Sequence, residues 1–395
     1  MEPRRTDPSW VPASADVVVI GGGIIGCAAA AIMADRGAQV VLVEGSEIGA
    51  GASGRNLGAI QHPFDPILAE LFVESVSRYR AIADVAASDF AIPAAPAGLL
   101  LLTRDADAAA AQAKRMRDVF PELEPETLTA EELQRLEPAL APGPAAVRLE
   151  TGYPIPPASA TEAWAALAEE RGATLVVGQP AEPEVDEERV AGVTLRNGKR
   201  IAADAVLVAA GPWSPSLVDP SGQWRPIAST WGVTIQVRLA GPTPRHLVEE
   251  DDEAELLNRA DAATARAAEI DPDAQPDPPS LFSLASVGGI STIGSTFLPD
   301  EPDAARIGSL LLRRAAAFLP SVVDAEMMGR RVCARPQSVD GRPFIGPVAG
   351  PEGLFICAGH GPWGISTGPA SAAMAARAIL DGTRPPPDLE ATRTL

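Results

Sequence analysis

A glycine-rich segment near the N-terminus has a spacing typical of phosphate binding. Gly21, Gly23 and Gly26 fit the pattern G-x-G-x-x-G, with Ile25 inside it. In this pattern the first glycine permits a tight turn and the second lets the backbone approach a pyrophosphate, while the third lets a helix pack closely on a strand. The N-terminus of that helix then presents unpaired N–H groups to the phosphates. The chemistry expected here is dinucleotide binding.

The elements around these glycines have the required order. The apolar residues 15–20 predict a buried strand, the Ala-rich residues 27–35 predict a helix that closes at Gly37, and residues 39–43 predict a second buried strand. Glu44 follows that strand and can accept hydrogen bonds from ribose hydroxyls, while its charge disfavours the extra phosphate of NADP. A glycine-rich turn without a ligand is the alternative interpretation, which this βαβ context disfavours.

Five later segments extend the pattern. They are residues 49–58 (GAGASGRNLG), 152–161 (GYPIPPASAT), 204–213 (DAVLVAAGPW), 335–346 (RPQSVDGRPFIG) and 358–369 (AGHGPWGISTGP). In this order they resemble the D-amino acid oxidase-like family of FAD-dependent amine and amino-acid oxidoreductases, which includes glycine oxidase, monomeric sarcosine oxidase and D-amino acid dehydrogenases. The resemblance covers roughly residues 15–380, and the order of several motifs is more specific than any one of them.

The resemblance implies FAD as the cofactor. Besides the glycines and Ile25 of the first motif, the residues expected to contact it are Glu44, Gly45, Ala52, Ser53, Arg55, Asn56, Leu57, Ala181, Ala210, Gly211, Trp213, Cys333, Gly359, Gly361, Gly364, Ile365, Ser366 and Thr367.

Arg335 matches the arginine that binds the substrate carboxylate in glycine-oxidase-like members of the family. A guanidinium suits a carboxylate because it makes two parallel charge-assisted hydrogen bonds. The alternative role is an ion pair at the surface or between domains. The family's second basic anchor is absent, since Pro362 and Trp363 stand where it is expected. This leaves room for an amine or an N-alkylated ligand.

Histidines and tryptophans supply further candidates. His62 and His360 lie beside the flavin motifs and are candidate catalytic residues, with a hydrogen-bonded structural role as the alternative for each. Trp363 is a third catalytic candidate. Trp231 and Trp363 are candidates for the walls of the substrate pocket because an aromatic cage suits an alkylated amine. Core packing is the alternative for both tryptophans.

Cys333 precedes Asp340 by seven positions. That spacing matches the cysteine that is joined covalently to the flavin in monomeric sarcosine oxidase. The alternative is a buried free cysteine of the core, and the covalent link is not favoured. Cys27 and Cys357 are interpreted as core residues.

The lysines bear on the electron acceptor. No lysine follows Lys199, so the lysine with which sarcosine-oxidase-like members activate oxygen is missing. Oxygen and another acceptor, such as a quinone or a protein, both stay open.

The resemblance implies oxidation of a C–N bond by hydride transfer to flavin N5, giving an imine that water hydrolyses. Small secondary or N-methylated amino acids are the favoured substrates. The alternatives are a D-amino acid dehydrogenase with a non-oxygen acceptor, and a non-catalytic flavoprotein or subunit of a larger complex. An NAD-linked dehydrogenase is disfavoured because it leaves the C-terminal flavin segments without a purpose.

Composition excludes several other classes. The 52 acidic residues against 32 basic ones give a net charge of −20, which opposes binding to nucleic acid and anionic lipid. No apolar run is long enough for membrane insertion, and residues 1–14 lack the apolar stretch of a signal peptide. The three scattered cysteines predict neither a disulfide framework nor a metal site. A cytoplasmic location is expected, and a homo-oligomer or hetero-oligomer is possible.

The predicted fold class is α/β, with a Rossmann-type FAD-binding domain and an α+β substrate domain. The FAD domain is expected to combine residues 14–90, 151–226 and 327–395, and the substrate domain residues 91–150 and 227–326, the latter with a mostly antiparallel sheet and helices on one side. Helices are predicted at 66–88, 131–136, 158–171, 307–318 and 368–380, and strands at 98–102, 174–177, 193–195, 200–203, 205–209, 228–240 and 355–357. The acidic residues 245–280 are expected to form an exposed helical insertion.

Overall fold

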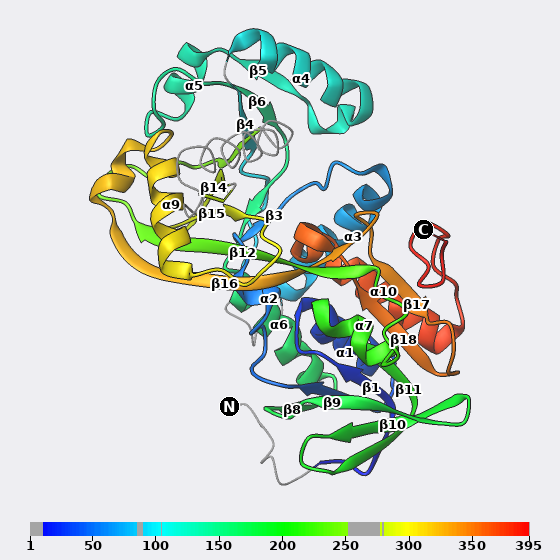
Figure 1. The fold of residues 1–395 in the computed structure, drawn as a ribbon. Helices are drawn as coiled ribbons and strands as arrows, with labels where there is room; N and C mark the ends of the chain where they lie inside the picture. The colour runs from blue at the N-terminus through cyan, green and yellow to red at the C-terminus, as the bar shows by residue number, and fades with distance from the viewer. Residues whose placement is uncertain (1–10, 85–89, 104, 252–276, 279, 395) are drawn as a thin grey trace.

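The computed structural model describes residues 11–84, 90–103, 105–251, 277–278 and 280–394. Its described part contains two eight-stranded sheets and one two-stranded sheet. The large sheets lie apart in Figure 1, and the long strands β12 (Ile227–Arg238) and β16 (Glu326–Ser338) extend from the second toward the first. The predicted fold class, α/β with a second, mostly antiparallel sheet, is confirmed. The assignment of segments to two domains stays a prediction.

The first sheet has a parallel centre. β1 (Ser14–Ile20) pairs in parallel with β2 (Val40–Glu44) on one side and with β11 (Arg200–Val208) on the other. Beyond β2, β8 (Thr174–Val177) adds a further parallel strand. Beyond β11, β18 (Leu354–Ala358) does the same. β17 (Phe344–Pro347) pairs antiparallel with β18, and β10 (Arg189–Leu195) joins β11 to β9 (Ala181–Asp186). Because parallel strands run in one direction, their carboxyl ends meet at one edge.

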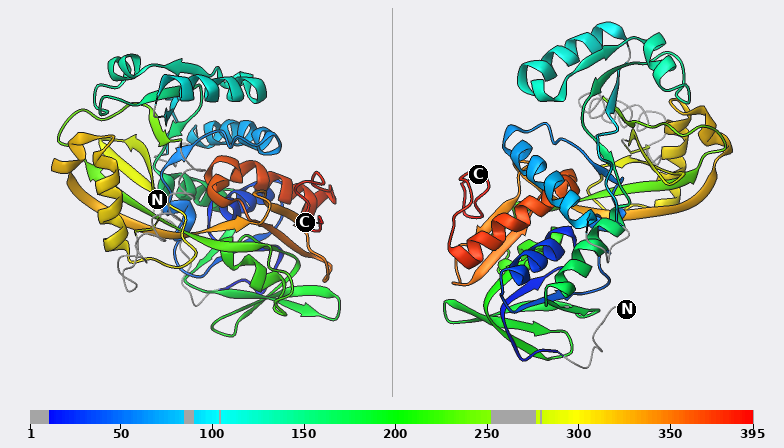
Figure 2. Two further views of the ribbon diagram at one scale, coloured as in Figure 1. Left: turned by 45° about the horizontal axis from the view of Figure 1, so that its top comes forward. Right: turned by 180° about the vertical axis from the view of Figure 1, so that it is seen from behind.

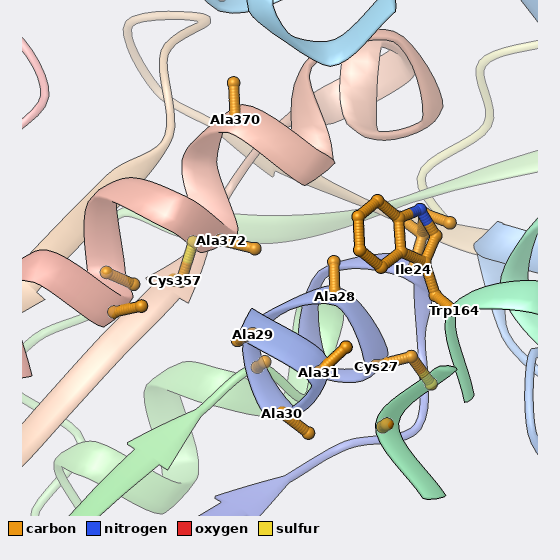
Figure 3. Packing of buried hydrophobic residues seen from close by; sticks show 14 of the residues in the cluster. Ile24, Cys27, Ala28, Ala29, Ala30, Ala31, Trp164, Cys357, Ala370 and Ala372 are labelled. Atoms are coloured by element: carbon orange, nitrogen blue, oxygen red, sulfur yellow. The ribbon is translucent and has the colours of Figure 1, made fainter. Parts of the chain in front are cut away.

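Small side chains let helices approach this sheet closely. The Ala-rich α1 (Ile24–Asp35) packs against α10 (Gly364–Asp381) and α6 (Pro157–Glu170), as both views of Figure 2 illustrate. Figure 3 shows Ala28 of α1 between Ala372 of α10 and Trp164 of α6. α3 (Pro66–Ala83) lies on α10, and its Tyr79 hydroxyl donates to the Ile365 carbonyl at 2.7 Å.

The second sheet has the order β16-β12-β15-β14-β13-β4-β6-β5. The bounds of its other strands are Ile290–Thr296 (β15), Ser280–Val287 (β14), Leu247–Glu250 (β13), Leu99–Thr103 (β4), Ala145–Leu149 (β6) and Glu126–Leu128 (β5). All neighbours are antiparallel except β13 and β4. α9 (Ala304–Ala316) packs on β12, β14, β15 and β16, while α4 (Ala106–Val119) and α5 (Ala130–Leu136) lie at the β5–β6 end.

Short elements join the two sheets. α2 (Ala52–Arg55) contacts α6 and β16, and β3 (Ala59–Ile60) pairs with β7 (Tyr153–Pro154) in the small sheet. α7 (Ser214–Val218) follows β11. This arrangement carries residues 52–60 from the edge of the first sheet toward the second.

Three expectations about elements are corrected. Residues 200–203 and 205–209 are not separate strands, because β11 continues through Asp204 as it passes from β10 to β1. The start of the acidic 245–280 segment is β13, whose Leu247 and Val248 are buried between β4 and β14. Within the rest of the predicted insertion, residues 252–276 and 279 lie outside the described residues, and Ser280 begins β14. α10 begins at Gly364, before the predicted residue 368.

Candidate functional site

A cavity of about 690 Å³ lies at the carboxyl edge of the first sheet. Ile20, Glu44 and Ala358, the last residues of β1, β2 and β18, line it on one side. Cys333 and Arg335 of β16 line it as well. The cavity is therefore bounded by both large sheets. Cofactors in open α/β sheets bind at this edge, and the volume is within the range of cofactor sites.

Most of the predicted site residues meet at this cavity. Those that line it are Gly21, Gly23, Ile25, Glu44, Gly45, Ala52, Ser53, Arg55, Asn56, Ala181, Ala210, Gly211, Trp213, Cys333, Arg335, His360, Gly361, Gly364 and Ile365.

The sequence analysis missed other residues of the lining. Pro180 precedes β9, Glu182 lies in β9 and Arg196 follows β10, and all three line the cavity. The nearest signal in the sequence is the Asn197-Gly198 pair, which is typical of a hairpin turn between β10 and β11 and does not indicate that its neighbours approach the cavity. Cys357, interpreted as a core residue, is fully buried and also lines the cavity.

The first glycine motif has the geometry of a phosphate site. Gly21 has φ of 117°, which favours glycine. A Cβ on Gly26 would lie 1.9 Å from the Gly21 carbonyl oxygen, so a side chain there would separate α1 from β1. The first turn of α1 contains no acidic residue, and its cap residue Gly23 supplies no side chain. The positive end of the helix dipole therefore faces the cavity with no carboxylate in the first turn of α1.

Glu44 is held at the end of β2 by two backbone groups. Its Oε2 accepts from the Gly22 N–H at 2.6 Å, and its Oε1 accepts from the Ser46 N–H at 2.7 Å. Each carboxylate oxygen keeps a further lone pair. The remaining lone pairs fit the ribose hydroxyls of a dinucleotide.

His360 is a buried polar residue that lines the cavity. It is 1% exposed, and within the described residues neither ring nitrogen has a hydrogen-bond partner. Burial lowers the pKa of His360 to about 3, so the ring is neutral at physiological pH. Unsatisfied buried nitrogens are costly. A polar ligand in the cavity would remove that cost, which fits a flavin nucleotide.

Arg335 presents a guanidinium to the same cavity. Its Nη1 donates to the Thr296 carbonyl at 2.7 Å, its Nη2 donates to the Ser295 hydroxyl at 3.2 Å, and its Cζ lies 4.7 Å from the centre of the Phe297 ring. Burial lowers the pKa of Arg335, opposed by Cys333, although an arginine remains charged. Across the described ranges no acidic residue forms an ion pair with it, so the ion-pair alternative gains no support.

Cys333 shares the cavity-facing side of β16 with two arginines. Alternate residues of a strand point to one face, so Arg331, Cys333 and Arg335 lie on the same side. Burial raises the pKa of the Cys333 thiol, while Arg335, Arg55 and Arg331 oppose that shift. Covalent attachment of FAD through Cys333 stays a prediction.

His62 lies away from the cavity lining. It is 2% exposed. The centre of its ring lies 4.9 Å from the centre of the Phe120 ring and 5.5 Å from the centre of the Phe72 ring. Its Nδ1 accepts from the Phe64 N–H at 3.2 Å. Burial lowers the pKa of His62, and the charge of Glu122 partly opposes that shift. The structure therefore places His62 in a hydrogen-bonded aromatic cluster, and its catalytic role gains no support.

The proposed aromatic cage is not assembled. Trp231 pairs with Ala334 and packs with the apolar side of β12 in the core beneath α9, so the expectation that it walls the pocket is wrong. The face of β12 that approaches Arg335 carries Gly232 instead. Trp363 packs edge-on against Phe64, with 6.3 Å between ring centres, and is absent from the cavity lining.

The remaining predicted cofactor residues support the cavity from behind. Gly26 packs on Gly21, Leu57 lies against Gly294, and Gly359 lies against Ile227 and Phe344. The Ser366 hydroxyl accepts from the Gln61 N–H at 3.0 Å, and the Thr367 hydroxyl donates to the Trp363 carbonyl at 2.8 Å. Among the helices the structure describes, none has the length and apolar character to span a membrane.

Comparison with known proteins agrees with this geometry. Residues 16–378 match the DAO family of FAD dependent oxidoreductases. The chain belongs to this family. Its cofactor is FAD, as predicted, and it is an oxidoreductase.

The most similar relatives include several enzymes of amino-acid oxidation. The chain is 30% identical to a glycine oxidase of Pseudomonas aeruginosa over 51% of its own length and 48% of the relative, so this match spans about half of that protein. It is 25% identical to a glycine oxidase of Geobacillus kaustophilus over 91% of its length and 92% of the relative. A D-amino acid dehydrogenase of Rhizorhabdus wittichii is 30% identical over 57% of this chain and 48% of the relative.

Solved structures show the same fold. The crystal structure of glycine oxidase from Geobacillus kaustophilus has a TM-score of 0.79 at 23% sequence identity, covering 97% of this chain and 100% of that one. The L-proline dehydrogenase from P. horikoshii has a TM-score of 0.77 at 21% identity, covering 96% of each chain. These similarities concern the fold.

Proposed function

We propose that this protein oxidises the C–N bond of a small amino acid. The cavity residues would hold FAD, which would supply the acceptor, at flavin N5, for a hydride from the carbon next to nitrogen; the resulting imine would be hydrolysed by water. The observation that carries the proposal is Arg335, a cation on the cavity wall whose hydrogen bonds are to neutral groups. The names of the relatives also support an amino-acid substrate.

Arg335 is held in place before substrate binds. Thr296 and Ser295 each accept from one terminal nitrogen, and the Phe297 ring packs against the guanidinium. A guanidinium has five N–H donors, so donors remain for a carboxylate. Because the side chain is already ordered, binding costs little additional entropy. Arg335 thereby fixes the substrate by its carboxylate and orients its amino carbon.

His360 supplies neutral hydrogen-bonding groups. Its low pKa keeps it uncharged at physiological pH, so it does not attract the substrate carboxylate away from Arg335. One ring nitrogen donates and the other accepts in the neutral form. We assign His360 to hydrogen bonding with the cofactor or the substrate.

A secondary or N-methylated amino acid stays the favoured substrate. The supporting observation is the absence of the second basic anchor, since Pro362 and Trp363 occupy its place. An aromatic cage no longer supports this preference, because Trp231 faces the core on the other side of β12.

A D-amino acid dehydrogenase with a non-oxygen acceptor is the second candidate. Lys114 pairs with Asp118 on the surface of α4, Lys199 is exposed beside the β10–β11 turn, and no lysine follows them. The chain thus lacks the lysine expected of an oxygen-activating site. A cytoplasmic location and the oligomeric state stay predictions.

The test is reduction of the flavin by substrate. Holoenzyme is mixed anaerobically with glycine, sarcosine or D-alanine, and the visible absorbance of the flavin is followed. Bleaching is expected, and Arg335→Met should lower kcat/KM by roughly 30-fold or more, as the loss of a buried charge pair requires. Reoxidation by oxygen or by an artificial dye separates the two candidates. No bleaching with any amine or amino acid would indicate a non-catalytic flavoprotein.

A further inference from the structure

A polar row crosses the second sheet. Ser283 of β14 pairs with Gly294 of β15 on one side and with Glu249 of β13 on the other. Side chains of directly paired residues lie on the same face of a sheet. A Cβ on Gly294 would lie 3.1 Å from the Ser283 hydroxyl and 3.7 Å from Leu57, so this row faces the segment that carries Asn56 along the cavity.

Gln61 connects the row to the cofactor cavity. Its side-chain Nε2 donates to Glu249 Oε1 at 3.0 Å, and its backbone N–H donates to the Ser366 hydroxyl at 3.0 Å. Ile365, the neighbour of Ser366, lines the cavity. Gln61, Ser283 and Glu249 are called here the acceptor cluster; none of them lines the cavity, and Gln61 and Ser366 connect the cluster to its wall.

Two atoms of the acceptor cluster have unused hydrogen-bonding capacity. Gln61 is 5% exposed and Ser283 is 6% exposed, and neither Gln61 Oε1 nor Ser283 Oγ has a partner within the described residues. A buried oxygen without a partner costs free energy. The missing partner must donate hydrogen bonds to Gln61 Oε1, since an amide oxygen only accepts.

An ammonium group meets these requirements. It has three N–H donors and a positive charge, which match the amide oxygen, the hydroxyl oxygen and the carboxylate of Glu249. We propose that the acceptor cluster binds a second amino group of the substrate, so that the substrate class is a diamino acid or another amino acid with a basic side chain. This inference rests on the proposed function.

The position of the cluster indicates a side-chain group rather than the reacting nitrogen. Arg335 reaches Thr296 on β15, whereas Glu249 lies on β13, two strands away, in the row of Gly294. Strand spacing and rise place the two positions roughly 12 Å apart. The amino group of an α-amino acid is two bonds from its carboxylate carbon, whereas a terminal amino group on a long side chain extends several bonds further toward Glu249. The cluster therefore suits the far end of a long side chain.

Matched ligands test the charge preference without turnover. Binding of 6-aminohexanoate and hexanoate to the holoenzyme is measured by calorimetry, since the pair differs at the terminal amino group. Wild type should bind 6-aminohexanoate about tenfold tighter or more, corresponding to a charged hydrogen bond. Glu249→Gln should remove this difference. Equal affinities for wild type would overturn the inference and would indicate that water satisfies the cluster.

Turnover provides an independent measurement. Lysine and norleucine, each as both enantiomers, are compared by kcat/KM, and lysine should be preferred by about tenfold or more in wild type. Glu249→Gln should lose this preference while retaining turnover of norleucine. An equal loss of both activities would overturn the inference, because Glu249 would then serve the reacting amine. If no amino acid bleaches the flavin, the proposed function fails, while the binding comparison still decides the cluster.

Glu250 is the matched control. It is the next residue of β13, and its carboxylate pairs with Arg314 and accepts from the Phe282 N–H at 3.1 Å. Adjacent residues of a strand point to opposite faces. Glu250→Gln removes the same charge from the opposite face. The ratio of the affinities for 6-aminohexanoate and hexanoate should therefore stay as in wild type. A ratio that falls equally in both variants would contradict a specific role for Glu249.

Discussion

Gly232 lies directly beneath the guanidinium of Arg335. A Cβ on Gly232 would come within 2.4 Å of both Arg335 Cζ and Arg335 Nη2. The absence of a side chain on β12 therefore lets Arg335 cross that strand and reach Thr296 on β15. The orientation of the proposed carboxylate anchor depends on a glycine in the neighbouring strand.

Gly232→Ala should displace the Arg335 guanidinium while the cofactor loop is left intact. We expect KM for an amino acid to rise about tenfold or more with FAD content unchanged, since a misplaced anchor weakens binding by at least about 1.4 kcal/mol. Steady-state kinetics and the flavin spectrum measure both quantities. Gly241→Ala is the control, because a Cβ there meets only Ser321 at 3.8 Å. An unchanged KM in Gly232→Ala would contradict the role given to Arg335.

Gly26→Ala should abolish FAD binding. The added methyl group would lie 1.9 Å from the Gly21 carbonyl oxygen, so α1 must move away from the loop that receives the phosphates. The purified variant should contain less than about one tenth of the wild-type flavin, consistent with a loss of more than 1.4 kcal/mol of binding free energy. Absorbance after denaturation measures the flavin. Retention of wild-type FAD content would show that the loop tolerates this separation.

Cys333 should hold FAD without a covalent bond. Its thiol is buried, and burial raises its pKa despite the nearby arginines, which disfavours the reactive thiolate. Acid precipitation should therefore release the yellow colour into the supernatant. A yellow pellet from wild type that becomes colourless in Cys333→Ser would instead establish the covalent link.

His360 should make stability depend on pH. Burial lowers its pKa from 6.5 to about 3 in the folded protein, so between these values only the unfolded chain binds the proton. The free energy of unfolding should consequently fall as pH decreases from about 6.5 toward 3. Denaturant unfolding of wild type and His360→Asn across this range tests the point, since the variant should lose less stability. Parallel curves for the two proteins would exclude this contribution.

The local motifs were predictable because short segments determine them. The strand, glycine turn and helix around Gly21 follow each other without a break, and Glu44 ends the next strand. Their arrangement depends on neighbouring residues and on the rules of βαβ packing. Many residues that line the cavity at the edge of the first sheet were accordingly named from the sequence, and their contact with FAD stays a prediction.

The apolar and polar faces of β12 were also predictable, from the alternation of residue types along the strand. Trp231, Val233 and Ile235 alternate with Thr230, Gly232 and Thr234, and alternation separates an apolar face from a polar one. The error with Trp231 came from assigning an aromatic residue to the cavity by its type alone. The polar face, which carries Gly232, is the one that approaches Arg335.

Other features depend on contacts between distant segments. The ring of His62 packs between Phe72 and Phe120, which come from α3 and the end of α4. Gln61, Glu249 and Ser283 meet through the pairing of β13 with β14 and the approach of β3. No spacing in the sequence indicates these contacts, because strand register is fixed by the whole sheet.

The two sheets that bound the cavity have different roles, so substitutions in each are expected to change different properties of the enzyme. The loops of the first sheet receive the cofactor, whereas β13, β14 and β16 of the second sheet carry the groups proposed to meet the substrate. Substitutions on the second sheet can therefore alter which amine is accepted while the affinity for FAD is preserved. A few substitutions on the second sheet can therefore change the substrate range during evolution, while the FAD-binding residues of the first sheet stay the same.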